Sequence, residues 1–181
     1  VENTPFYPEG GGQISDTGVI ETESCSLLVT NVQKINNIIV HQAILQSGVI
    51  RLGDDILLKI NNDRRKKIAA NHSSTHLLNQ ALRDTLGDHV EQKGSLVTDK
   101  YLRFDFSHNK ALSIDEIRKI ETIISFEINS DRETLQKMSS YKDAIKSGAL
   151  AFFDEKYSDD VRVVNVGTCL LYTSDAADEE D

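Results

Sequence analysis

Residues 63–86 form a long helix-forming run that constrains the fold more strongly than any other segment. Its apolar side chains recur at helical spacing and share one broad face: Ile68, Leu78, Leu82 and Leu86. Gly87 follows the run, and a glycine just past the last turn often ends a helix because it adopts positive φ without strain. The sequence therefore predicts one amphipathic helix that ends at Gly87.

Two histidines, His72 and His76, lie four residues apart in this predicted helix. That spacing places both imidazoles one turn apart on one face, at the border of the apolar stripe. Two neutral ring nitrogens in this arrangement can share one Zn²⁺ ion. The residues between them include no glutamate, so the His-Glu-x-x-His class of zinc protease, which uses that glutamate as general base, is excluded. The pair predicts a metal site of another class.

Thr75 and Gln92 are candidates for contacting a substrate. Thr75 is next to His76, so its hydroxyl can enter the same pocket and hydrogen-bond a small polar group, or it can bond back to its own helix. Gln92 carries a neutral amide that can orient a water or a carbonyl, although this residue type is also common on surfaces. The other histidines, in a strand or after turns, are weaker candidates: His41, His89 and His108.

Residues 1–60 have the pattern of short β-strands separated by turns. Three strands are predicted, at 29–35, 38–44 and 55–60. Asn36-Asn37 suits a two-residue hairpin turn. The run Gly10, Gly11, Gly12 and Gln13 is incompatible with regular structure; it either lets the backbone approach another surface closely or serves as a flexible turn. Several short strands favour a small barrel or half-barrel.

Strand and helix patterns alternate after Gly87. Ser113-Ile114-Asp115-Glu116 is a capping box that opens a helix with an apolar stripe predicted to be buried: Ile117, Ile120, Ile124 and Ile128. Further strands are predicted at 95–97, 101–106, 134–138 and 161–166, with a short helix that ends at Gly148. The predicted fold class is α+β: a small antiparallel β-barrel over 1–61 and an α+β domain over 62–167.

Composition indicates a soluble globular protein. Of the 181 residues, 39% are hydrophobic and 27% charged, and no apolar stretch reaches the ~20 residues that span a bilayer. Two distant cysteines, Cys25 and Cys169, do not make a disulfide framework, and no secretory leader is present, which predicts a cytoplasmic location. The polar start at Val1 predicts a piece of a longer protein.

Charge is unevenly distributed along the chain. Five acidic residues lie in the last seven positions: Asp175, Asp178, Glu179, Glu180 and Asp181. Without these five, the net charge of −9 becomes −4, which does not argue against a nucleic-acid partner. Arg64-Arg65-Lys66-Lys67 is the one dense basic cluster, either a solvated helix start or a patch that contacts phosphates. Residues 168–181 are predicted to form a disordered acidic tail.

Four motifs together resemble the editing region of alanyl-tRNA synthetases. They are Thr4–Gln13 with Asp16-Thr17-Gly18; Asn71–Leu78, which holds the two histidines; His89–Val97 with Leu102–His108; and Gly148–Ala151 with Glu155–Tyr157 and Val161–Val164. The resemblance covers residues 4–167 in unbroken order.

The resemblance implies a β-barrel joined to a zinc-binding domain that hydrolyses tRNA(Ala) wrongly charged with serine or glycine. It implies that His72 and His76 bind one Zn²⁺ ion, that Thr75 recognises the serine hydroxyl, and that Gln92 positions substrate or water. The Gly10–Gln13 loop would line the approach of the tRNA acceptor end. ATP would bind only in the aminoacylation domain, which lies outside this chain with the other synthetase domains. An aminoacylation pocket that fits alanine cannot exclude the smaller glycine, and it rejects serine only weakly because serine merely adds a hydroxyl. A second site that hydrolyses the wrong products is therefore needed.

The chain departs from this family after Gly167. Members continue with Ser-x-Glu-Leu-Cys-Gly-Gly-Thr-His, whose Cys and His complete the zinc site; here the Cys would fall at Ser174, and Cys169 is out of register. Hydrolysis by this chain is therefore expected to be impaired. The alternatives are a free-standing editing protein of the AlaX type, a tRNA-binding module without hydrolysis, and the editing domain of threonyl-tRNA synthetases, against which the segments Phe6–Gln13 and Arg103–His108 argue.

Overall fold

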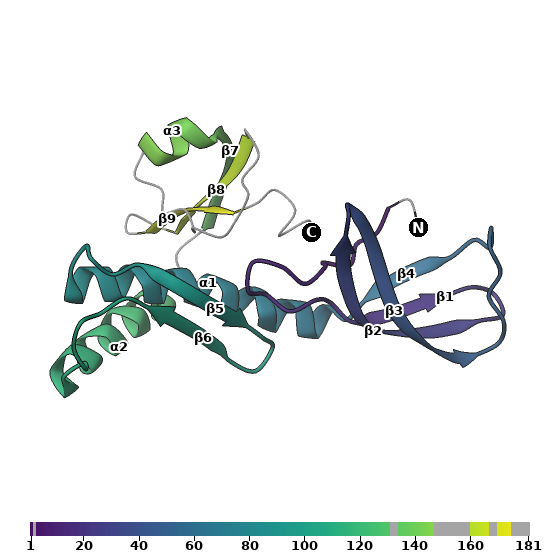
Figure 1. The fold of residues 1–181 in the computed structure, drawn as a ribbon, viewed down its shortest axis with the longest axis horizontal. Helices are drawn as coiled ribbons and strands as arrows, with labels where there is room; N and C mark the ends of the chain where they lie inside the picture. Colours follow the sequence, from purple (N-terminus) through teal and green to yellow (C-terminus); the bar gives the residue numbers. More distant parts are fainter. Residues whose placement is uncertain (2, 131–133, 147–159, 167–169, 175–181) are drawn as a thin grey trace. The chain divides into compact units, whose positions relative to one another are not determined.

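The computed structural model describes residues 1, 3–130, 134–146, 160–166 and 170–174. In chain order the elements are β1 (Gly18–Glu21), β2 (Ser26–Ile35), β3 (Ile38–Ser47), β4 (Leu57–Ile60), α1 (Asn62–Leu86), β5 (Gln92–Val97), β6 (Leu102–Phe106), α2 (Ile114–Asn129), β7 (Thr134–Ser140), α3 (Tyr141–Lys146), β8 (Asp160–Val166) and β9 (Leu170–Ser174) (Figure 1). No helix in these ranges has the length and apolar content needed to cross a membrane.

The chain divides into two compact units. The first contains residues 1–71 and 96–101, and the second contains residues 72–95 and the described residues from 102 onward. Helix α1 contributes its first ten residues to the first unit and the rest to the second. The domain boundary predicted at residue 61 stays a prediction.

The first unit is built on an antiparallel sheet with strand order β3-β2-β1-β4. Asn36 and Asn37 join β2 to β3 with φ angles of 49° and 65°. This left-handed conformation matches the right-handed twist of the flanking strands, and asparagine adopts it more readily than most residues. The predicted hairpin is confirmed, and the predicted strand at 55–60 corresponds to β4.

The sheet of the first unit is open. A barrel closes only when its edge strands bond to each other, and in the described part of the chain β3 and β4 are edges that do not pair. β1 and β4 have four residues each, whereas β2 and β3 have ten, so the long hairpin has no edge of matching length to meet. Of the predicted small barrel or half-barrel, the closed form is therefore not what this sheet has, whereas the α+β class is confirmed.

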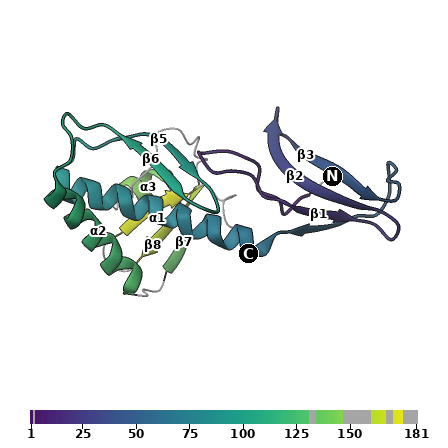
Figure 2. The same ribbon diagram turned by 90° about the horizontal axis from the view of Figure 1, so that it is seen from below.

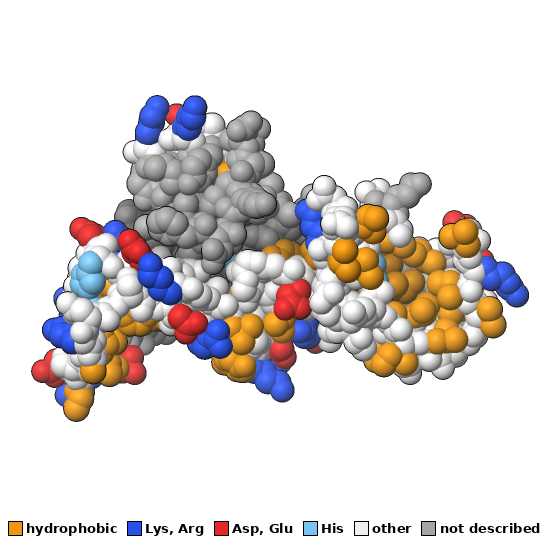
Figure 3. Space-filling model, viewed as in Figure 1, with side chains coloured by type: hydrophobic (Ala, Val, Ile, Leu, Met, Phe, Trp, Pro, Cys, Tyr) orange, Lys and Arg blue, Asp and Glu red, His pale blue; other side chains and the backbone are white. Residues whose placement is uncertain are grey.

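Apolar side chains of the first unit fall into a buried group and an exposed group. The buried cluster consists of Phe6, Ile20, Val29 and Val32. Figure 3 shows further hydrophobic side chains gathered on the surface of this unit. The exposed group includes large residues of the sheet that are 39% to 66% accessible: Leu28, Ile38, Ile44, Leu45 and Leu57. The sheet thus keeps one compact core and a broad apolar surface.

The second unit packs the later part of α1 against α2 and the β5–β6 hairpin (Figure 2). Its core is the buried cluster Ala81, Leu82, Val90 and Ile120, with partly buried neighbours that include Leu78, Leu86, Phe104 and Phe106. The predicted helix is confirmed, and the Gly87 N–H donates to the Arg83 carbonyl at 2.8 Å with φ at 113°. Glycine permits this helix end because it has no Cβ to clash.

Helix α2 begins at the predicted capping box. The Ser113 side chain accepts from the Glu116 N–H, and the Glu116 carboxylate accepts from the Ser113 N–H at 2.8 Å. The predicted apolar stripe is only partly right. Ile120 is buried, but Ile117 and Ile128 are 41% and 57% exposed. The contacting side chains are Ile120, Ile123 and Ile124, so the buried face is narrower than the full stripe.

A third sheet has the antiparallel strand order β7-β8-β9. β7 and β8 match the predicted strands, and Ala144 of α3 shares a buried cluster with Val161 and Val163 of β8. Strand β9 was not expected, because Leu170–Ser174 falls within the predicted tail; its Leu-Leu-Tyr-Thr sequence favours a strand, and it pairs with β8 from Val166↔Leu170 to Arg162↔Ser174. Gly148, residues 168–169 and residues 175–181 lie outside the described residues.

Glu116 makes α2 sensitive to acid. Hydrogen bonds from the Ser113 backbone and hydroxyl, with Lys110 nearby, lower the pKa of Glu116 from 4.5 to about 2. A lowered carboxyl pKa stabilises the fold above pH 4.5, and this contribution is lost as the pH falls from 4.5 through 2. We predict that Glu116→Gln, which keeps the capping box, makes the melting temperature less dependent on pH in this range.

The control is Glu121→Gln, which changes an exposed acidic residue of the same helix away from its cap. We measure the melting temperatures of the two variants and of the unmodified chain across this pH range and compare how strongly each depends on pH. Equal pH dependence in all three proteins would contradict the role assigned to Glu116.

Candidate functional site

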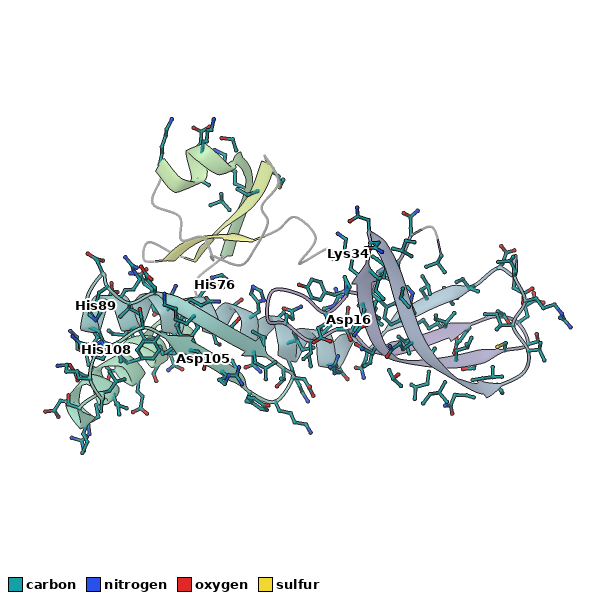
Figure 4. The ribbon with its side chains drawn as sticks, viewed as in Figure 1. Asp16, Lys34, His76, His89, Asp105 and His108 are labelled. Carbon is teal, nitrogen blue, oxygen red and sulfur yellow. The ribbon has the colours of Figure 1, made fainter. Side chains whose placement is uncertain are left out.

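The two histidines of α1 lie together on one face of the helix. Their ring centroids are 5.1 Å apart, and the ring planes are tilted by 41°. His76 is 1% exposed, whereas His72 is half-buried. Figure 4 shows His76 on α1. The spacing predicted from the sequence is thus present as an actual side-by-side pair of imidazoles.

Burial keeps His76 neutral. Removal from water lowers the pKa of His76 well below its ordinary value of 6.5, and the positive charge that His72 can carry lowers it further. Both causes disfavour the protonated ring. A neutral imidazole is the form that ligates a metal ion, so His76 is held in a binding-competent state at neutral pH.

Polar side chains continue along the same helix. Thr75 is 4% exposed and precedes His76. Asn79 lies one turn beyond Thr75, is 8% exposed, and its Oδ1 atom has no hydrogen-bond partner in the part of the chain that the structure describes. Sequence reasoning missed Asn79, although its spacing from Thr75 and His76 was a usable signal. An unsatisfied buried carbonyl oxygen is costly, so this atom is a candidate acceptor for a ligand.

Gln92 is the first residue of β5 and belongs to the same unit as His72 and His76. Its Nε2 atom donates to the Ser95 hydroxyl at 3.5 Å. Its Oε1 atom is buried and has no hydrogen-bond partner among the described residues. This amide oxygen is therefore available to accept a hydrogen bond from a water or a substrate.

The described residues contain a pair of candidate ligands for a metal ion, His72 and His76. In the ranges that the structure covers, no group of three or more His, Cys, Asp or Glu side chains is arranged to hold one. Zinc sites in proteins use at least three protein ligands. His72 and His76 fit the first two positions in residue type and proximity, and His76 also in its neutral state. Cys169 lies outside the described residues.

The Gly-rich loop Gly10–Gln13 belongs to the first unit. The Gly10 N–H donates to the Gln13 carbonyl at 3.1 Å, and the Gln13 N–H donates to the Gly10 carbonyl at 2.8 Å. Gly11 and Gly12 adopt φ angles of 55° and 83°, which disfavour side chains with a Cβ. The loop thus forms a turn closed by two backbone hydrogen bonds, and both alternatives for its role stay predictions.

The basic cluster at the start of α1 is largely engaged within the first unit. Arg64 donates to the Ser15 carbonyl at 2.7 Å, and Arg65 forms an ion pair with Asp16. The two arginines are therefore not a freely solvated helix start, and the phosphate-contacting patch stays a prediction. Lys66 and Lys67 are exposed.

The three histidines predicted as weak candidates are held by local contacts. His89 Nε2 and His108 Nδ1 are 2.9 Å apart, and Figure 4 shows the two side chains side by side. His41 Nε2 lies 2.8 Å from the Thr4 hydroxyl. His89 and His108 thus share one hydrogen bond, and His41 has another with Thr4.

Comparison with known proteins first indicates a class. Residues 1–64, which include the Gly-rich loop and the first sheet, match the family model described as tRNA synthetases class II (A). This match covers about a third of the chain and assigns the segment to the same class as the motifs.

Similarity over nearly the whole chain then points to one kind of synthetase. The chain is 46% identical over 169 residues to the alanine–tRNA ligase of Cupriavidus necator, covering 93% of the chain and 19% of that relative. It is 46% identical over 168 residues to the alanine–tRNA ligase of Rhodopseudomonas palustris, covering 92% and 19%. It is 45% identical over 168 residues to the alanine–tRNA ligase of Nitrosomonas europaea, covering 92% of the chain and 20% of that relative. The chain thus spans about a fifth of the length of the curated relatives it matches.

The buried neutral imidazole predicts an acid-labile second unit. Because the pKa of His76 is lowered in the folded state, the unfolded chain binds more protons below pH 6.5, and stability falls there. In metal-free buffer we expect the free energy of unfolding to fall by about 1.4 kcal/mol per pH unit below 6.5 from this residue. Urea unfolding at about pH 7.5, 6.5 and 5.5 measures this slope.

His76→Gln should remove this part of the slope, because glutamine does not titrate. His89→Gln is the matched control, since His89 is exposed in the same unit. A slope that persists in the His76 variant and disappears in the His89 variant would contradict the assignment.

Proposed function

We propose that this chain is the editing region of an alanine–tRNA ligase and that its chemistry is hydrolysis of tRNA(Ala) mischarged with serine or glycine. The observation that carries the proposal is the pair of His72 and the buried His76 on α1, in a chain 46% identical to an alanine–tRNA ligase over 93% of its length. The partner is the acceptor end of tRNA(Ala). The location proposed is the cytoplasm, where aminoacylation takes place.

His72 and His76 would hold one Zn²⁺ ion, a role supported by their proximity and by the neutral state of His76. When bound, zinc supplies a Lewis acid beside the ester that links the amino acid to the tRNA. The third ligand is not among the described residues, so the proposal includes weak zinc binding and impaired hydrolysis by this chain. ATP would act only in the aminoacylation part of the parent ligase.

Two side chains near this pair would handle the substrate. The Thr75 hydroxyl, which is buried, would hydrogen-bond the serine side chain, because a hydroxyl both donates and accepts. The buried Oε1 atom of Gln92 would accept a hydrogen bond from the attacking water or from the amino group of the substrate. The Gly10–Gln13 loop would line the path of the tRNA acceptor end, where its small residues permit close backbone approach.

The test is hydrolysis of Ser-tRNA(Ala) with added Zn²⁺, measured as release of labelled serine. We use the chain as it stands and a version in which the residues after Gly167 are replaced by Ser-x-Glu-Leu-Cys-Gly-Gly-Thr-His. We predict slow hydrolysis by the first and faster hydrolysis by the second. His72→Ala should reduce the rate by about a hundredfold or more, because it removes a metal ligand.

His89→Ala is the control, since it removes an exposed histidine of the same unit. Equal rates in the His72 and His89 variants would show that the α1 pair is not the reaction centre. No hydrolysis by either the original or the extended chain would overturn the editing proposal.

Thr75 offers a separate prediction on specificity. Thr75→Val keeps the shape of the side chain but removes the hydroxyl that would recognise serine. We expect it to slow hydrolysis of Ser-tRNA(Ala) about tenfold relative to Gly-tRNA(Ala). Thr75→Ser retains the hydroxyl and should preserve the preference. An unchanged ratio of the two rates in Thr75→Val would exclude a role for Thr75 in serine recognition.

A tRNA-binding module without hydrolysis is the second candidate. The observation that favours it is that the described residues supply two metal ligands and no third. Retained binding of tRNA(Ala) without hydrolysis, by both the original and the extended chain, would select this function.

A further inference from the structure

A buried ion pair connects the first turn of α1 to the segment that carries the Gly-rich loop. The Asp16 side chain is 4% exposed, and that of Arg65 is 19% exposed. Arg65 Nε donates to Asp16 Oδ1 at 3.0 Å, and its second guanidinium nitrogen donates to Asp16 Oδ2. This two-point geometry fixes both the distance and the orientation of the two groups. Neither residue is part of the candidate metal site.

The same pair also holds the backbone on both sides of the loop. Asp16 Oδ2 accepts a hydrogen bond from the Tyr7 N–H at 2.8 Å, and the Asp16 N–H donates to the Tyr7 carbonyl at 3.0 Å. Arg65 donates to the Pro5 carbonyl at 2.8 Å. The segment before the loop, at Pro5 and Tyr7, and the segment after it, at Asp16, are therefore hydrogen-bonded to each other and to Arg65 of α1.

The loop that this point closes is itself bonded to a second segment of the first unit. The Val97 N–H donates to the Gly12 carbonyl at 2.8 Å, and the Ile14 N–H donates to the Val97 carbonyl at 3.1 Å. Gln13 and Val97 form a parallel β-bridge. These backbone bonds give amide protons whose exchange with solvent reports on the order of the loop.

Burying two charges is costly, and a buried ion pair often stabilises a protein less than apolar residues of the same size would. The planar guanidinium group, however, donates two parallel hydrogen bonds to a carboxylate in one arrangement, so the pair selects a single geometry. Here the groups held in that geometry are the flanks of a loop rich in glycine, which by itself has many accessible conformations. The pair is suited to ordering the loop.

We propose that Asp16 and Arg65 are positioning residues that hold the Gly10–Gln13 loop in the conformation that binds the tRNA acceptor end. This inference rests on the function proposed above and adds two residues to it. It also separates Arg65 from its basic neighbours: Arg65 acts through the loop rather than through a phosphate contact, because its Nε and one terminal guanidinium nitrogen donate to Asp16 and Pro5.

The test compares two variants. Arg65→Lys keeps the positive charge but cannot make the two-point hydrogen bond of a guanidinium group, and Asp16→Asn keeps the size of the side chain but removes its negative charge. The matched control is Glu21→Gln, which removes the exposed Lys59–Glu21 ion pair of the same unit. Three quantities are measured: amide hydrogen exchange, the melting temperature, and the Kd for an acceptor-stem minihelix of tRNA(Ala) from fluorescence anisotropy.

We expect both loop variants to speed exchange at the amides of Gln13, Ile14 and Val97, while those of Val29 and Val32 in the buried core keep their protection. We also expect both to raise the Kd about tenfold, because a displaced loop no longer matches the substrate. Glu21→Gln should change neither the amide exchange of the loop nor the Kd.

Four results would overturn the inference. Unchanged exchange in the loop would show that the pair does not order it. Equal loss of protection at Val29 and Val32 would show a purely global role in stability. Faster loop exchange with unchanged Kd would exclude a role in binding. Tighter binding by Asp16→Asn with weaker binding by Arg65→Lys would show direct phosphate contact by Arg65.

The minihelix experiment also separates this inference from the function it rests on. If the unmodified chain does not bind the minihelix, the proposed tRNA function fails, and the binding role of the pair fails with it. The exchange data still decide whether the pair orders the loop, because they require no ligand.

Discussion

Continuous backbone hydrogen bonding along α1 is the constraint on which the other features depend. At about 3.6 residues per turn, the helix decides which side chains share a face and which residues can reach a given neighbour. Its first turn carries Arg65, which pairs with Asp16. Its middle carries the polar side chains His72, Thr75, His76 and Asn79. Its later turns carry Ala81 and Leu82, which belong to the core of the second unit. A break in this helix would disturb all three features at once.

Two opposite solutions to burying an ionisable group involve residues of this helix. His76 is buried as a neutral ring, because loss of water lowers its pKa, and this is the form that a metal ion needs. Asp16 is buried beside the guanidinium of Arg65, which compensates for lost hydration through two hydrogen bonds. The first solution keeps the imidazole in the neutral form that can ligate a metal ion, whereas in the second the carboxylate bonds to a guanidinium of the same protein. This difference is why we assign chemistry to the histidine pair and positioning to the ion pair.

Local patterns in the sequence predicted most elements but not how they assemble. The Asn36-Asn37 turn, the helix end at Gly87 and the capping box at Ser113 depend on neighbouring residues only, and all three are present. The open sheet depends on pairing between segments far apart in the sequence, which no local pattern encodes. Strand β9 pairs with the neighbouring β8, and its Leu-Leu-Tyr-Thr sequence was a local signal that the prediction of a tail passed over. In the site, the spacing of His72 and His76 was readable, whereas Asn79 and the Asp16–Arg65 pair emerged only once side-chain burial and contacts were known.

The central claim is that the α1 site edits mischarged tRNA, and selectivity tests it most directly. We would measure single-turnover hydrolysis of Ser-tRNA(Ala) and of correctly charged Ala-tRNA(Ala) with saturating Zn²⁺, using the more active of the original and extended chains. The account predicts that the serine ester is cleaved at least about tenfold faster, because serine carries a hydroxyl that the buried Thr75 side chain would recognise and alanine does not. Equal rates for the two esters would contradict it.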